Sequence, residues 1–134
     1  MISLEDRDLI RWCGEQGTGV LSYGPLGYGI LAGAVQEDAV FAPEDWRSGS
    51  HEDPGPFGRE RLPGALAIVR GLRAVAERMG LTPAQLALAW NVHQPGVTSA
   101  IAGSRRADHV RQNAAAGDLE LDAATLAELE ALLE

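Results

Sequence analysis

The chain has 134 residues, which is the length of one domain with a hydrophobic core of its own. Its formal net charge of -8 argues against general binding of nucleic acid or of anionic membranes, because both depend on a basic surface. The 11 residues counted as lysine or arginine are all arginine, so the chain has no lysine for a Schiff base or a P-loop.

The cysteine content and the first residues of the chain bear on its location. The single cysteine, Cys13, excludes a disulfide within the chain, and no apolar run approaches the roughly 20 residues that span a bilayer. Residues 1–6 have neither the basic nor the apolar segment of a secretory signal, so we expect the mature chain to begin here and to be cytoplasmic. The three histidines lie far apart and have no paired spacing, so no metal site is expected.

The first part of the chain predicts a helix, a strand and a glycine-rich turn. Ser3 and Asp6 resemble a capping box, and apolar residues continue a helix to about Gln16. Residues 20–23 then predict a short buried strand. The turn at 24–29 contains glycines that allow the backbone to approach a ligand or a neighbouring element closely.

Residues 36–63 predict a long loop inside a single domain that covers residues 1–134. The segment is rich in proline, glycine and charged residues, and a loop of this length in a compact domain is usually functional or disordered. Its aromatic residues favour an ordered lid. They are Phe41, Trp46 and Phe57.

The second half of the chain predicts further helices and a second strand. Apolar residues recur at three- and four-residue spacing from Ala65 to Met79, and Gly80 closes this helix. Thr82 caps the next helix, with Pro83 at its first position. The remaining predicted elements are a strand at 97–102, a helix from about Arg106 to Ala115, and a last helix capped by Asp122. Two short buried strands joined through helices imply parallel pairing, so the predicted fold class is α/β.

The segment that leads from the second strand into the following helix is the strongest indication of a binding site. Residues 103–106 read Gly-Ser-Arg-Arg. A helix N-terminus offers unpaired N–H groups and the positive end of its dipole, and arginine adds forked donors suited to phosphate. The turn therefore predicts a local anion site. The alternative is that the two arginines form a solvated pair beside Asp108, and His109 reads as a surface residue of the helix.

Three segments, in order, resemble the aldo-keto reductase family. Residues 20–33 resemble the seventh strand of that family's barrel and the loop after it. Residues 81–90 are similar to its penultimate barrel helix, and residues 101–113 to the segment at its eighth strand that holds the cofactor. The resemblance implies an α/β fold that is a partial TIM barrel, with two short parallel strands and about five helices from the C-terminal part of the barrel.

The resemblance also implies a cofactor, NADP(H), and assigns residues to it. Tyr23 matches the aromatic residue that stacks on the nicotinamide ring, and the backbone from Gly24 to Gly27 lies along the pyrophosphate. Without the resemblance, Tyr23 reads as a core aromatic and this segment as a plain tight turn. The full set of implied cofactor residues is Tyr23, Gly24, Pro25, Leu26 and Gly27 on the loop, Gly103, Ser104 and Arg105 at the 2′-phosphate, and Gln112 and Asn113 near the adenine.

The catalytic set of the family does not match any part of this chain. The resemblance places its Asp, Tyr, Lys and His on strands two to four, whereas the chain matches only the part of the barrel after strand six and has no lysine. In that chemistry a tyrosine donates a proton while a neighbouring ammonium group lowers its pKa. We therefore do not expect a self-sufficient reductase.

Three functions stay open from the sequence. The first is a cofactor-binding part of a barrel that works as a homo-oligomer, with a dimer favoured, or with a chain that carries the other half, because two strands alone leave edges and apolar faces uncovered. The second is an enzyme of non-redox chemistry, such as cyclisation, dehydration or isomerisation of a small metabolite. The third is a non-catalytic binding module. No nucleic-acid or membrane partner is expected for any of them.

Overall fold

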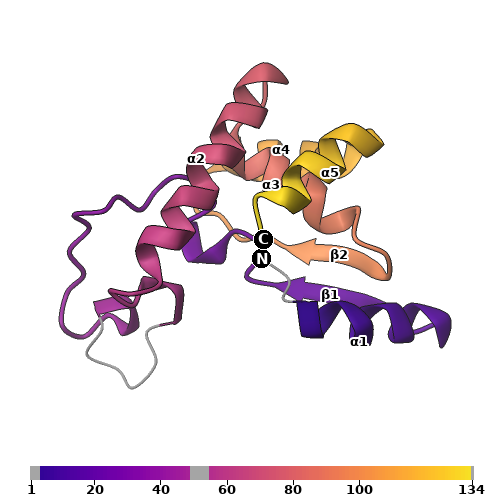
Figure 1. Cartoon of the computed structure of the whole chain (residues 1–134), viewed down its shortest axis with the longest axis horizontal. Coiled ribbons are helices and arrows are strands. Elements are labelled where there is room, and N and C mark those ends of the chain that lie inside the picture. Colours follow the sequence, from indigo (N-terminus) through magenta and orange to yellow (C-terminus); the bar gives the residue numbers. More distant parts are fainter. Residues whose placement is uncertain (1–3, 49–54, 134) are drawn as a thin grey trace.

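The computed structural model describes residues 4–48 and 55–133, and in these residues it shows a two-stranded parallel sheet with helices around it (Figure 1). This arrangement confirms the predicted α/β class and the predicted order of elements. The helices and strands are α1 (Leu4–Glu15), β1 (Val20–Tyr23), α2 (Leu62–Arg78), α3 (Pro83–Val92), β2 (Val97–Ile101), α4 (Ala107–Ala115) and α5 (Ala123–Ala131). Short 3-10 helices lie between them at η1 (Gly27–Gly29), η2 (Trp46–Ser48), η3 (Gly55–Phe57) and η4 (Ala116–Asp118).

The strands β1 and β2 pair in parallel, as a connection through helices requires. Their register places Tyr23, the last residue of β1, beside Ile101, the last residue of β2. The register shifts between Val20 and Leu21, and the N–H of Val20 donates a hydrogen bond to Oγ1 of Thr98 at 3.1 Å at this irregularity. Both strands therefore end at the same edge of the sheet.

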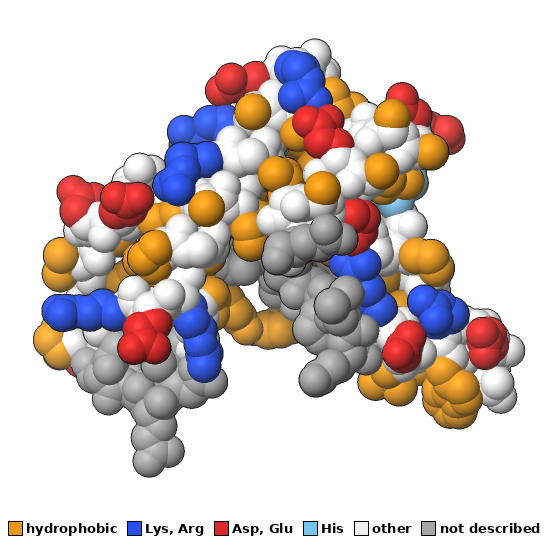
Figure 2. Space-filling view, viewed as in Figure 1, with side chains coloured by type: hydrophobic (Ala, Val, Ile, Leu, Met, Phe, Trp, Pro, Cys, Tyr) orange, Lys and Arg blue, Asp and Glu red, His pale blue; other side chains and the backbone are white. Residues whose placement is uncertain are grey.

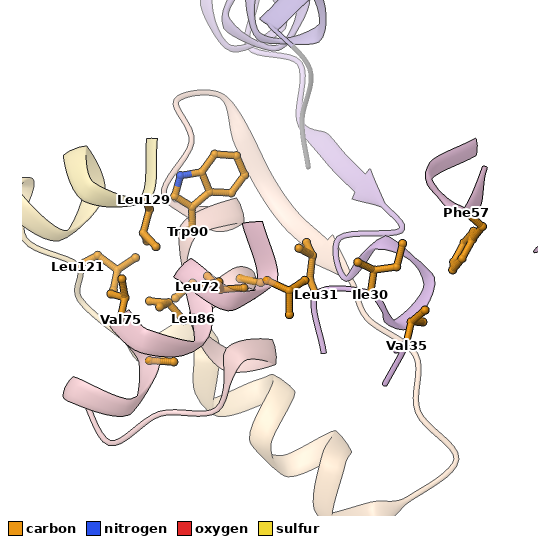
Figure 3. Packing of buried hydrophobic residues seen from close by; sticks show 14 residues of the cluster. Ile30, Leu31, Val35, Phe57, Leu72, Val75, Leu86, Trp90, Leu121 and Leu129 are labelled. Carbon is orange, nitrogen blue, oxygen red and sulfur yellow. The ribbon is translucent and has the colours of Figure 1, made fainter. Parts of the chain in front are cut away.

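The hydrophobic core is built around α3 (Figure 3). This helix is apolar on almost every side, which is typical of a helix that is enclosed by its neighbours, and its residues 86–91 are all buried. Leu86 and Trp90 are the largest fully buried side chains. Their neighbours in the core include Leu72 and Val75 of α2, Leu129 of α5, and Ile30, Leu31 and Phe57 of the loops.

A carboxylate on α5 links three helices at the edge of this core. Glu130 accepts a hydrogen bond from Nη1 of Arg7 in α1 at 2.7 Å and from Nε1 of Trp90 in α3 at 2.9 Å. The guanidinium group of Arg7 also lies 5.6 Å from the centre of the Trp90 ring. A buried indole N–H needs a partner, so Glu130 explains how Trp90 lies in the core without an unpaired donor.

Two helix caps that the sequence predicts are present in the structure. Oγ1 of Thr82 accepts from the N–H of Gln85 at 3.2 Å, and the Gln85 side chain accepts from the N–H of Thr82 at 3.1 Å, which is a complete capping box. Oδ1 of Asp122 accepts from the N–H of Thr125 at 2.7 Å. Both caps are confirmed, whereas Ser3, half of the first predicted cap, lies outside the described residues.

One face of the sheet is exposed, so the prediction of two buried strands is wrong for that face. Leu21, Tyr23 and Ile101 are 63%, 77% and 50% exposed. Leu21 and Tyr23 share a face because side chains two apart in a strand point the same way, and Ile101 is the register partner of Tyr23. Parallel strands are normally covered on both faces, but the described helices leave this one open.

The described part of the long loop is held by a series of aromatic contacts. The ring centre of Trp46 lies 4.8 Å from that of Tyr28 and 5.3 Å from that of Phe57. Both pairs of rings meet edge to face. Phe41 lies 5.4 Å from Phe57, and the guanidinium group of Arg47 lies 4.4 Å from the Phe41 ring. These contacts attach the loop to Tyr28, just beyond β1. Residues 49–54 of the predicted lid lie outside the described part.

Candidate functional site

A groove of about 710 Å³ lies at the edge of the sheet where both strands end. Its walls come from the loop after β1, the end of β2, the start of α3, and α4. In α/β folds, ligands bind outside the carboxyl ends of parallel strands. The groove therefore occupies the position expected of a binding site in this fold class.

Most of the predicted cofactor residues line this groove, although they come from three segments far apart in the sequence. Strand pairing brings the end of β1 next to the end of β2, and α4 follows directly after β2. The predicted residues in the lining are Tyr23, Gly24, Pro25 and Leu26 from the first segment, Gly103 and Ser104 from the second, and Gln112 and Asn113 from the third. The geometry is thus compatible with one extended ligand that touches all three segments.

Two predicted residues, Gly27 and Arg105, are not among the described residues of the lining. The N–H of Gly27 donates to the carbonyl oxygen of Gly24 at 2.9 Å, so Gly27 closes the turn that shapes the loop. The side chain of Arg105 is exposed. Their contacts with a cofactor stay predictions.

The loop after β1 has a backbone conformation that restricts which residues it accepts. Gly24 has a φ of 64°, in the left-handed region that favours glycine. Tyr28 also lies there, with φ 54° and ψ 31°, which is uncommon for a residue with a side chain. A Cβ atom added at Gly24 would lie 3.5 Å from the Tyr28 ring. The loop therefore runs close to the ring of Tyr28 and places both residues in the groove wall.

Tyr23 stands at the end of β1 with most of its side chain exposed. Its exposed fraction is 77%, and its ring meets that of Tyr28 edge to face with 6.2 Å between the centres. This position excludes the alternative that Tyr23 is a core aromatic. An exposed ring at the rim of a groove can stack on a flat heteroaromatic ligand.

The turn before α4 is held by hydrogen bonds of its own. Oγ of Ser104 accepts from the N–H of Arg106 at 3.1 Å. The guanidinium fork of Arg106 donates to the carboxylate of Asp108 through Nε at 3.1 Å and Nη2 at 2.6 Å. These bonds from Arg106 hold the pKa of the Asp108 carboxyl at about 2, below its usual 3.8. Arg106 therefore forms an ion pair with Asp108. For Arg106 this agrees with the alternative to an anion site, in which the arginine lies beside Asp108.

Sequence reasoning missed several residues of the groove. His109 precedes Gln112 and Asn113 by three and four residues, and this spacing places all three on one face of α4. Helical periodicity could therefore have identified His109 as a groove residue. Thr82 was recognised only as a helix cap. Further missed residues of the lining are Tyr28, Ala32, Ala34 and Ala84.

Two kinds of feature are absent from the described part of the chain. No group of three or more histidine, cysteine, aspartate or glutamate side chains is arranged to hold a metal ion there. No described helix combines the length and the apolar character that crossing a membrane requires.

The sequence matches the model of the Aldo/keto reductase family over residues 1–134. It is 28% identical over 126 residues to Aldo-keto reductase str7 of Strobilurus tenacellus, which covers 94% of this chain and 36% of that protein. It is 33% identical over 105 residues to a probable voltage-gated potassium channel subunit beta of Arabidopsis thaliana, covering 78% of this chain and 31% of that protein.

The structure is similar to that of the glycerol dehydrogenase AKR11B4 from Gluconobacter oxydans. The TM-score is 0.82 at 25% sequence identity, and the match covers 96% of this chain and 38% of that chain. The chain thus spans about a third of the length of these relatives, and its fold corresponds to part of their TIM barrel. By its sequence over residues 1–134 and by its fold, the chain belongs to the aldo/keto reductase family.

Proposed function

We propose that this chain forms the NADP(H)-binding part of an aldo-keto reductase barrel. The observation that carries the proposal is the groove at the carboxyl ends of β1 and β2, where residues 23–26, 103–104 and 112–113 come together. Active sites of TIM barrels lie at this end of the strands. Membership of the family supports the same choice of ligand.

Each wall of the groove offers chemistry that suits one part of the cofactor. The exposed ring of Tyr23 stacks on the nicotinamide, and the glycine at Gly24 lets the backbone approach the pyrophosphate. Gly103 and Ser104 precede the N-terminus of α4, where backbone N–H groups and the helix dipole favour a phosphate. The side-chain amides of Gln112 and Asn113 form hydrogen bonds with the adenine. The bound cofactor supplies the hydride, and these residues position it.

The chain does not reduce a carbonyl group by itself in this proposal. A tyrosine acid in that chemistry works beside an ammonium group that lowers its pKa, and the 134 residues contain no lysine. The proton donor must come from the rest of a barrel. A second copy of the chain or a complementing chain covers the exposed sheet face at Leu21 in this arrangement and leaves Tyr23 open to the cofactor.

A titration with NADPH followed by tryptophan fluorescence tests the proposal. Trp46 contacts Tyr28, which lines the groove, so we expect a saturable change in its emission as the cofactor binds. In the matched variant Trp46→Phe we expect a smaller fluorescence change, because only Trp12 and Trp90 remain, while calorimetry still detects the same affinity. Absence of binding at millimolar cofactor in the wild-type chain contradicts the proposal.

The lack of lysine favours a second candidate, an enzyme of non-redox chemistry that uses the same groove. Cyclisation, dehydration or isomerisation needs no hydride, so the groove would hold a small metabolite instead of a dinucleotide. Turnover of a metabolite in the absence of any nicotinamide cofactor, together with failure to bind NADPH, distinguishes this candidate from the first.

A further inference from the structure

Asn91 is the one buried polar side chain among the residues that the structure describes. It lies near the end of α3 and is 2% exposed, with Trp90 and Val92 as its neighbours in sequence. An amide loses its hydrogen bonds to water when it is buried, so it destabilises the fold unless another group replaces the water. The group that bonds Asn91 therefore shows what this side chain holds in place.

The partner of Asn91 is Ser22 in β1. Oγ of Ser22 donates a hydrogen bond to Oδ1 of Asn91 at 2.5 Å, and the same Oγ lies 3.4 Å from the carbonyl oxygen of Ser99 in β2. A hydroxyl group has one hydrogen to donate, and the much shorter distance assigns it to Asn91. This bond attaches β1 to α3.

Ser22 immediately precedes Tyr23, and successive side chains of a strand point to opposite faces of the sheet. Ser22 is therefore directed to the face that α3 covers, and Tyr23 to the open face at the rim of the groove. A rotation of this part of the strand would move both side chains together. The bond from Ser22 to Asn91 thus fixes the direction in which the Tyr23 ring points.

The end of β1 is held on one side only. The described sheet has two strands, so β1 has β2 on one side and no described strand on the other, and a cleft of about 260 Å³ lies between β1 and α1. Gly24, the next residue, has no side chain that could pack. At the start of β1, the N–H of Val20 is bonded to Oγ1 of Thr98 at 3.1 Å. Side-chain hydrogen bonds therefore attach both ends of the strand, and the one beside Tyr23 is the bond to Asn91.

We propose that Asn91 is a positioning residue for the nicotinamide half of the cofactor, because its bond to Ser22 holds the Tyr23 ring in the direction that stacks on the nicotinamide. The role of Asn91 rests on the proposed function, since it concerns the same groove. Stacking of an aromatic side chain on a flat ring depends on the distance and the tilt between the two rings. A ring that is already held in one direction loses less freedom when the ligand binds. Asn91 is not among the described lining residues of the groove, so it acts through Ser22 and Tyr23.

Calorimetry on the full chain with two ligands tests the role of Asn91. The ligands are NADP⁺ and ADP-ribose 2′-phosphate, which is the cofactor without its nicotinamide. Stacking on Tyr23 makes NADP⁺ the tighter ligand of the wild-type chain. In Ser22→Ala, which removes the donor, we expect the affinity for NADP⁺ to fall about fivefold, as the loss of one hydrogen bond predicts, and the affinity for ADP-ribose 2′-phosphate to stay the same. Asn91→Leu, which removes the acceptor at similar volume, gives the same result.

Two further variants serve as controls. Ser22→Thr keeps the hydroxyl group and retains the wild-type ratio of the two affinities. Thr98→Val removes the side-chain hydrogen bond at the opposite end of β1, and it also retains this ratio. The melting temperature of each variant, measured by circular dichroism, separates a loss of stability from a loss of binding. Ser22→Ala decides the test if Asn91→Leu does not fold.

A wild-type ratio of the two affinities in Ser22→Ala overturns the inference. An equal loss of affinity for both ligands in that variant does the same, because it marks Asn91 as a structural residue only, and so does an equal change of the ratio in Thr98→Val. Failure of the wild type to bind either ligand overturns the proposed function together with the role of Asn91. Binding of both ligands by the wild type with equal affinity overturns the role of Asn91 alone.

Discussion

Arg106 and Asp108 show how two side chains in one turn decide what the turn can bind. The sequence offers two arginines at a helix N-terminus, which indicates an anion site. In the structure Arg106 forms a two-pronged ion pair with Asp108, so its charge is already compensated. Arg106 and Asp108 are two positions apart in the sequence, and this spacing does not show whether the guanidinium group points toward a ligand or toward the neighbouring carboxylate. The side-chain geometry shows that it points toward the carboxylate.

The low pKa of the Asp108 carboxyl depends on this ion pair. Removing the guanidinium group with Arg106→Gln raises the pKa of the Asp108 carboxyl from about 2 toward its usual 3.8, because the largest cause of the lowering is the hydrogen bond from Arg106. The pair favours the folded state above pH 3.8 and ceases to do so as pH falls toward 2. Its effect on stability is small because both side chains are exposed.

Carbon-13 NMR of the side-chain carboxyl groups measures this pKa directly. Arg111→Gln removes an exposed arginine within α4 and serves as the control, with no change expected at Asp108. A pKa that stays near 2 in Arg106→Gln would show that the ion pair is not its cause.

At the scale of elements, the close approach of α1 to the turn before β2 depends on glycine. Gly96 has a φ of 93°, and a Cβ atom there would collide with the carbonyl oxygen of Ile10 in α1. On the other side of the contact, a Cβ atom on Gly14 would lie 3.3 Å from the Cα of Gly96. The backbones of α1 and of this turn thus touch, and the contact places α1 beside the sheet (Figure 1).

We expect Gly96→Ala to destabilise the protein by about 2 kcal/mol, because it forces an unfavourable backbone conformation and pushes α1 away from the turn. Gly64→Ala is the matched control, since Gly64 lies in α2 with no atom within 4 Å of an added Cβ. That substitution stabilises a helix by about 0.5–1 kcal/mol. Urea unfolding monitored by circular dichroism measures both values, and equal midpoints for the two variants would contradict the packing described for α1.

At the scale of the whole molecule, apolar surface lies open on the sheet and on α1. Leu21 is 63% exposed on the sheet face, and Leu9 and Trp12 of α1 are 60% and 56% exposed. Hydrophobic side chains gather over α1 at the lower right of Figure 2. Exposed apolar surface of this kind is typical of sites where another protein surface packs. The chain also spans about a third of the length of its relatives.

We expect the chain to associate through this surface, as a dimer or with a complementing chain. Leu21→Glu places a charge on the sheet face and shifts the chain toward monomer, because burying an unpaired charge is costly. Val40→Glu is the control, since Val40 is 94% exposed and belongs to the long loop, not to the sheet. Light scattering at micromolar concentration measures the mass, and a well-folded wild-type monomer would contradict association with a second copy of the chain.

The sequence by itself determined the elements of this protein and their order. Thr82 and Asp122 identified two helix starts, and apolar spacing identified α2, because caps and helical periodicity depend on residues at most four positions apart. The three family-like segments identified the barrel and most of the groove for the same reason, since each is a continuous stretch of chain.

Only the tertiary structure decided which side chains face the groove and which face of the sheet stays open. Pairing of β1 with β2 joins segments 77 positions apart, as Val20 and Val97 show, and no local pattern contains that information. His109 lies in the groove wall, whereas Arg105 is not among its described lining residues. The contact between Trp46 and Tyr28 attaches the long loop to the groove. These outcomes depend on packing between distant segments, where side-chain direction and strand register act together.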